Sequence, residues 1–112
     1  MTPYRIVFMT AGAEEEAVRI AHALVERRLA ACVNIVSPVR SIYRWEGKVC
    51  DEQEHLLVAK THVAQVAGLM ACVEELHSYE VPEALAMPIE TGLRPYLQWV
   101  EESCSQPGTP EG

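Results

Sequence analysis

One segment constrains the fold of this chain more than any other. Residues 29–45 (LAACVNIVSPVRSIYRW) are apolar and β-branched, Glu46 and Gly47 supply turn chemistry, and residues 49–60 return as a second strand-like segment. The pattern predicts a long β-hairpin. Pro38 should mark a bulge or bend about halfway along its first arm, because proline cannot donate to a strand ladder.

The predicted hairpin is longer than the domain that carries it. The 112 residues favour one compact domain, whose diameter would be about 34 Å. An arm of about 13 residues would extend about 43 Å. The arm must therefore overhang, and it would expose Ile42, Tyr43, Trp45 and unpaired backbone groups near its tip. Proteins usually bury such side chains and pair such backbone groups against another chain. The sequence therefore predicts oligomerisation by strand pairing, but it does not fix the number of subunits.

The remaining periodic segments predict the order of strands and helices along the chain. Residues 4–10 and 84–89 have the pattern of buried strands, and residues 13–28, 63–77 and 93–104 have that of helices, the first closed by Arg27 and Arg28. The order βαββαβ plus a final helix predicts an α+β, ferredoxin-like split βαβ fold. We expect a single domain over residues 1–104 and a disordered tail over residues 105–112, which are rich in proline and glycine.

Charge and composition exclude several classes of function. Sixteen acidic residues against nine basic ones give a formal net charge of −7, which disfavours binding to nucleic acid or to an anionic membrane. No apolar run approaches the length of a membrane span, and residues 1–4 do not begin a signal peptide, so we expect a cytoplasmic protein. The four cysteines have neither disulfide-framework nor zinc-finger spacing.

Several segments resemble the CutA divalent-cation tolerance proteins. The similar segments are residues 24–34 (LVERRLAACVN), 41–49 (SIYRWEGKV), 54–61 (EHLLVAKT), 77–83 (HSYEVPE) and 92–99 (GLRPYLQW). They occur in order, and the likeness runs from about residue 4 to residue 100. The resemblance implies a ferredoxin-like subunit in a tight trimer, similar in architecture to the PII signalling proteins, with hairpins that pair between neighbours. It also implies association with copper or other divalent cations, and it brings no catalytic reaction.

The same resemblance points to Cys32 and His77 as metal ligands. A thiolate and an imidazole suit copper or zinc. The family usually has proline after this histidine, whereas this chain has Ser78, which predicts a less rigid loop. Structural roles remain open for both residues: Cys32 as a small buried side chain, and His77 as a packed residue at a helix C-terminus. Met9 could add a thioether, although methionine in an apolar strand is usually core.

The other motif residues combine aromatic rings with charged groups. If they converge across a subunit boundary they would line a cleft, the usual place for a small ligand, although aromatic residues near a hairpin tip are more often interface core. These candidates are Tyr43, Trp45, Lys60, Tyr79, Glu80 and Glu83.

The function predicted from the sequence is non-enzymatic binding of copper or another divalent ion by a homotrimer. Cys32 and His77 could form a nucleophile and base, but the sequence has neither a glycine-rich anion loop nor a nucleophile elbow. A PII-like sensor of a small ligand and a trimeric scaffold for another protein remain alternatives.

Overall fold

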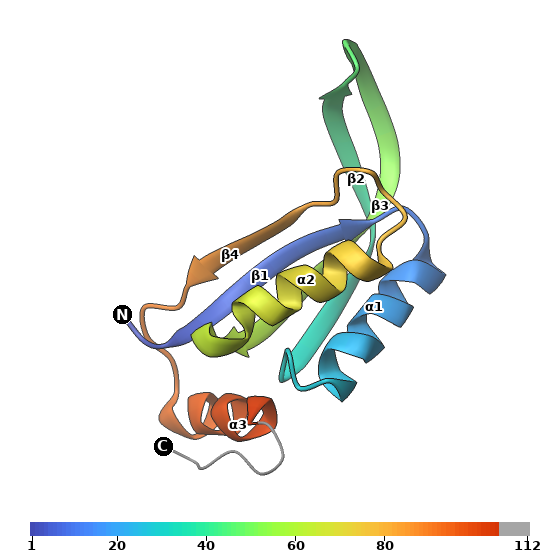
Figure 1. The fold of residues 1–112 in the computed structure, drawn as a ribbon. Helices are drawn as coiled ribbons and strands as arrows, with labels where there is room; N and C mark the ends of the chain where they lie inside the picture. Colours follow the sequence, from blue (N-terminus) through green and yellow to red (C-terminus); the bar gives the residue numbers. More distant parts are fainter. Residues whose placement is uncertain (106–112) are drawn as a thin grey trace.

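Four antiparallel strands form one sheet in the order β2-β3-β1-β4. The computed structural model describes residues 1–105. The elements along the chain are β1 (Tyr4–Ala11), α1 (Glu14–Glu26), β2 (Cys32–Trp45), β3 (Lys48–His62), the 3-10 turn η1 (Val63–Gln65), α2 (Val66–Leu76), β4 (Ala84–Pro88) and α3 (Arg94–Cys104). The predicted α+β fold, βαββαβ with a final helix, is confirmed (Figure 1).

The β2–β3 hairpin extends well beyond the rest of the fold, as Figure 1 shows. Its arms have 14 and 15 residues and stay paired from Cys32 opposite Lys60 to Trp45 opposite Lys48. The molecule measures 48 × 26 × 22 Å, and its radius of gyration is 14.8 Å, above the roughly 13 Å of a compact domain of this size. The predicted overhang is therefore present.

Local chemistry shapes the hairpin at two points. Glu46 and Gly47 both have positive φ, 49° and 79°, which is the conformation of a type I′ hairpin turn. The strand register shifts between Val36 and Val39, so the bulge predicted at Pro38 is confirmed. Inside the bulge the ring Nδ1 of His55 lies 2.6 Å from the hydroxyl of Ser37.

The main core lies between the sheet and the two helices α1 and α2. Alternate residues of β1 and β3 point toward these helices, and they pack with apolar residues of α1 and α2. Met9 belongs to this core at 1% exposure, which is the ordinary role for methionine in an apolar strand. The largest members of the core are Val7, Met9, Ile20, Leu24, Leu57, Leu69 and Val73.

The opposite side of the sheet is apolar and lacks the cover of α1 and α2. Phe8 lies directly opposite Val58 on one neighbouring strand and Leu85 on the other. Leu85 and Met87 are 60% and 53% exposed. We call this surface the open face, and its apolar members are Ile6, Phe8, Val36, Leu56, Val58, Leu85 and Met87.

The third helix packs at the end of the sheet. Val100 and Cys104 of α3 form a second, smaller core with Tyr4 and Ala31. Tyr4 also donates a hydrogen bond from its hydroxyl to Glu101, at 3.2 Å. Most of the open face therefore stays uncovered within residues 1–105.

The C-terminal end of helix α1 departs from the sequence prediction. Helix α1 ends at Glu26, not at Arg28, because Arg28 takes a left-handed conformation with φ 58° and the Leu29 amide turns back to the Leu24 carbonyl at 2.8 Å. The tail predicted to be disordered lies outside the described residues except for Ser105. The hydroxyl of Ser105 donates to the Glu101 carbonyl at 2.9 Å.

Within residues 1–105, no helix has the length and apolarity that a membrane span requires.

Candidate functional site

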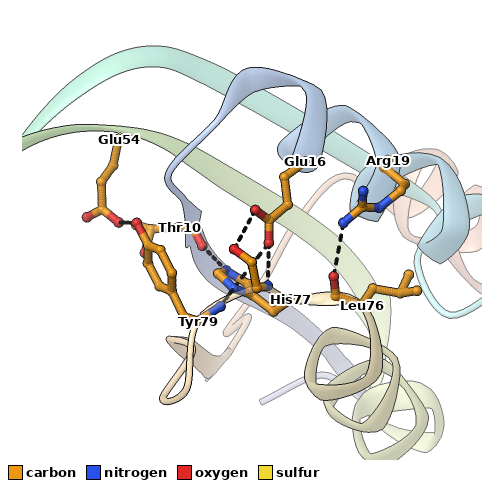
Figure 2. A network of polar contacts seen from close by, with 8 residues as sticks. Thr10, Glu16, Arg19, Glu54, Leu76, His77 and Tyr79 are labelled. Atoms are coloured by element: carbon orange, nitrogen blue, oxygen red, sulfur yellow. Dashed lines mark hydrogen bonds and ion pairs between the residues drawn. The ribbon is translucent and has the colours of Figure 1, made fainter.

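His77 is held by the protein at both ring nitrogens. It directly follows α2, and its side chain is 1% exposed. Nε2 lies 2.7 Å from the Thr10 carbonyl, to which it donates, and Nδ1 accepts from the Tyr79 amide at 3.0 Å (Figure 2). This pattern assigns the proton to Nε2 of the neutral ring. A metal ion at either nitrogen would have to replace one of these hydrogen bonds.

Glu16 anchors the loop that carries His77. Its carboxylate accepts from the Ser78 amide at 2.6 Å and from the Ser78 hydroxyl at 2.8 Å, and one oxygen lies 3.4 Å from Nδ1 of His77. A proline at position 78 could make neither of these bonds. The serine that replaces the family's proline therefore gains its own attachment, contrary to the expected loss of rigidity.

These contacts decide the ionisation of Glu16. Burial opposes the charged form, but the two hydrogen bonds from Ser78, together with the adjacent His77 ring and the guanidinium of Arg19, outweigh it, so the pKa of Glu16 is lowered. The carboxylate therefore stabilises the folded state above its ordinary pKa, and this contribution is lost as the pH falls through the lower folded value.

The lowered pKa of Glu16 should make the stability of the protein depend on pH. Replacing Glu16 with glutamine should lower the free energy of unfolding at pH 7 by about 2 kcal/mol, because the two charge-assisted bonds from Ser78 to the buried carboxylate are lost. The difference from the wild type should shrink as the pH falls below about 4. Urea denaturation between pH 7 and pH 3 measures both effects. Glu15→Gln, an exposed neighbour in the same helical turn, should show neither, and parallel pH profiles for Glu16→Gln and wild type would contradict the assignment.

A groove of about 670 Å³ lies between the hairpin and the loop that joins α2 to β4. Five of the six residues expected at a subunit boundary line this groove within a single chain: Tyr43, Trp45, Tyr79, Glu80 and Glu83. Lys60 does not line it. Lys60 lies opposite Cys32 and Ile6 in the sheet, and its Nζ donates to the Asn34 side chain.

Sequence reasoning missed several residues of this groove. Glu54 is 6% exposed, and it accepts a hydrogen bond from the Tyr79 hydroxyl at 2.8 Å (Figure 2). Burial raises the pKa of Tyr79, and this hydrogen bond raises it further. Glu54 opens the motif at residues 54–61, but it stands among four polar or charged neighbours, so the sequence has no signal for its burial. The other missed residues are Thr10, Ser41, Ile42, Ser78 and Val81.

Cys32 occupies a different part of the molecule from His77. It begins β2 opposite Lys60, and its sulfur lies 3.6 Å from the Asn34 side-chain oxygen. Its neighbours Val33 and Ile35 face the core, so Cys32 points toward the open face. His77 bonds to Thr10 of β1. The β1 residue level with Cys32 is Ile6, which lies four residues along β1 from Thr10 and two strands away from Cys32. Those offsets are about 13 Å and 10 Å, so one chain does not bring the two residues together.

Metal-binding side chains are dispersed throughout the described structure. Within residues 1–105, no three or more histidine, cysteine, aspartate and glutamate side chains form a group that could hold a metal ion. Residues 1–105 of one chain therefore do not by themselves form a site with three or more such ligands.

Comparisons with known proteins agree on one family. The family model described as "CutA1 divalent ion tolerance protein" matches residues 5–103. A "Divalent-cation tolerance protein CutA" from Thermus thermophilus is 51% identical over 98 residues, covering 88% of this chain and 95% of that protein. A crystal structure of CutA from Xylella fastidiosa superposes with a TM-score of 0.90 at 35% identity, covering 93% of this chain and 100% of that one.

Some relatives are much longer. "Protein CutA" from Mus musculus is 46% identical over 105 residues, which cover 91% of this chain but 59% of the mouse protein. The shared region includes the sheet, the helices and the long hairpin. From the match over residues 5–103 and the identity to the bacterial relative, the chain belongs to the CutA1 divalent ion tolerance family.

Proposed function

We propose that this chain is a divalent-cation tolerance protein that assembles as a homotrimer and binds copper or another divalent ion without catalysing a reaction. The observation that carries the proposal is the open face, which combines an apolar surface with the thiol of Cys32. The names of the relatives, which refer to tolerance of divalent cations, support the metal part of the proposal.

The apolar surface supports assembly. Exposed or partly exposed apolar side chains occur on all four strands of the open face, and burying such a surface against other copies is favourable at about 25 cal/mol per Å². The overhanging hairpin also leaves backbone groups of β2 and β3 without partners beyond the end of β1, a pattern that favours strand pairing between chains. The number of three subunits is proposed from the resemblance to the CutA family, which implies a trimer similar to that of the PII proteins.

The position of Cys32 supports a metal site at the subunit interface. A thiolate favours copper or zinc over magnesium or calcium. Because Cys32 and His77 are apart in one chain, a shared site requires Cys32 of one subunit and His77 of another, and His77 must release one of its two hydrogen bonds. Such a site would hold exchangeable metal, since two ligands are too few for a closed structural centre.

Copper titration tests the metal part of the proposal. Cys32→Ser should weaken copper(I) binding by at least about tenfold, and binding should weaken toward pH 5 because the ligands must lose protons. His77→Gln should also weaken it, since glutamine can still donate to Thr10 but offers no imidazole. Cys50→Ser removes another partly exposed thiol and serves as the control. If Cys32→Ser stays within about twofold of wild type, Cys32 is not a ligand.

A cytoplasmic location completes the proposal. All four cysteines within the described residues are free thiols, and thiols persist in a reducing compartment.

Of the alternative functions, an anion or nucleotide sensor gains no support from the groove, whose lining includes Glu54, Glu80 and Glu83 but neither lysine nor arginine.

A further inference from the structure

The overhanging hairpin leaves the sheet at one narrow point. β1 ends at Ala11, opposite His55, and the first β2–β3 pair after the bulge is Val39 opposite Glu54. Beyond this base, the strand pairing described for residues 1–105 joins the two arms to each other alone (Figure 1). Two-stranded ribbons twist more strongly than wider sheets and are marginally stable in isolation. The inclination of the overhang therefore depends on what holds it at the base.

Tyr79 bonds to the hairpin at this base. Its hydroxyl donates to Glu54 at 2.8 Å, from the loop between α2 and β4 (Figure 2). Tyr43, in contrast, donates to Glu52 within the hairpin itself. The bond from Tyr79 therefore links the overhang to a different part of the fold.

The loop that carries Tyr79 is tied to the main body of the fold. The Tyr79 amide donates to Nδ1 of His77, and the centroids of the two rings lie 4.6 Å apart. Ser78, between them, bonds twice to Glu16 of α1, and His77 bonds to the Thr10 carbonyl of β1. Tyr79 therefore connects the base of the hairpin to α1 and β1.

Gly12 leaves room for the hydroxyl of Tyr79. A Cβ at Gly12 would lie 2.7 Å from that oxygen, which is too close for both atoms to keep their places. The positive φ values among the glycines of residues 1–105 are confined to Gly47, so the backbone at Gly12 can accept alanine. Gly12→Ala is therefore expected to displace the phenol from Glu54 without straining the backbone.

We propose that the Tyr79–Glu54 hydrogen bond is a strap that sets the inclination of the hairpin and prepares each chain for assembly. The arm from Val39 to Trp45 extends about 20 Å beyond the base, so a tilt of about 10° would move its tip by about 3.5 Å. Such a shift would misplace Ile42 and Trp45, which are 66% and 42% exposed in one chain, against a neighbouring subunit. This inference rests on the homotrimer proposed above.

The strap should act on association rather than on dissociation. Without it, only a fraction of the chains would hold the hairpin at the angle that assembly requires, and association slows with that fraction. In the assembled protein the neighbouring subunits hold the hairpin, so the lifetime of the assembly should not change. A side chain that bonded across the interface would behave in the opposite way, because loss of interface contacts mainly speeds dissociation.

Two rates test the strap: reassembly from urea-unfolded chains, followed by light scattering, and exchange of subunits between labelled and unlabelled protein. Tyr79→Phe removes the hydroxyl, and Gly12→Ala displaces it. Each should slow reassembly at least about fivefold, as expected for the loss of one hydrogen bond, and leave subunit exchange within about twofold of wild type.

Tyr4→Phe is the matched control for these variants. It also removes a hydroxyl that donates to a glutamate, Glu101, but this bond joins β1 to α3 at the opposite end of β1 from Gly12. Both of its rates should equal those of wild type. Circular dichroism on the same samples follows folding of the chain, so slow folding is distinguished from slow assembly.

Two kinetic results would overturn the proposal: reassembly of either strap variant at the wild-type rate, and faster subunit exchange in either one. A wild type that stays monomeric would refute the homotrimer and, with it, the role of the strap in assembly. Hydrogen exchange then tests the strap by itself, because amides over residues 41–52 should exchange faster in Tyr79→Phe than in Tyr4→Phe. Equal exchange in these two variants would refute the strap as well.

Discussion

Replacing Phe8 with aspartate is expected to convert the assembled protein into monomers. Phe8 lies on the open face between Val58 and Leu85, and assembly would bury a carboxylate from every subunit against apolar side chains. An unpaired buried charge costs roughly 3–5 kcal/mol, and symmetry repeats that cost at each interface. The single chain should tolerate the change, because Phe8 points away from the core under α1 and α2. Light scattering should therefore report the mass of one chain.

Val18→Asp is the matched control for this variant. Val18 is 40% exposed on α1, on the far side of the sheet from Phe8, and the substitution adds the same charge. Its mass should equal that of the wild type. If Phe8→Asp also keeps the wild-type mass, subunits do not associate through the open face.

Replacing His77 with alanine should lower the free energy of unfolding by about 3 kcal/mol. The ring is buried, and its loss would leave the Thr10 carbonyl and the Tyr79 amide without their partners and create a cavity. His77→Gln should cost less, since an amide can restore the bond to Thr10. Urea denaturation at fixed protein concentration measures the difference, because assembly makes apparent stability depend on concentration.

His22→Ala provides the control for this experiment. His22 lies on the exposed side of α1, with 72% of its side chain exposed, and its replacement should change stability by no more than about 0.5 kcal/mol. A similarly small effect at His77 would mean that its two hydrogen bonds do not stabilise the loop, and the ring would then be freer to bind a metal.

The fold was predictable because its signals are local. Alternating and helical periodicity located every strand and helix, and Glu46, Gly47 and Pro38 carried specific backbone preferences. The error at the end of α1 came from Arg28, whose positive φ has no signal in an arginine. The overhang followed from comparing the length of one arm with the size of a compact domain.

The site was less predictable because it depends on contacts between distant segments. Glu16 had the appearance of a first-turn acidic residue that favours the helix dipole, yet it binds Ser78, 62 positions away. Lys60 was placed in the cleft through its motif, but strand alternation and register put it beside Cys32 and Asn34. The grouping of Tyr43 and Trp45 with Tyr79 required the hairpin to lean over the α2–β4 loop, which no residue pattern encodes.

In the proposed assembly, the open face holds three copies of this chain together. The most direct test is the solution mass of wild-type protein at micromolar concentration, measured by light scattering before and after treatment with a chelator. We expect about three times the 12.5 kDa chain mass in both conditions, because the apolar face rather than a metal ion drives assembly. A mass near that of one chain in either condition would contradict it.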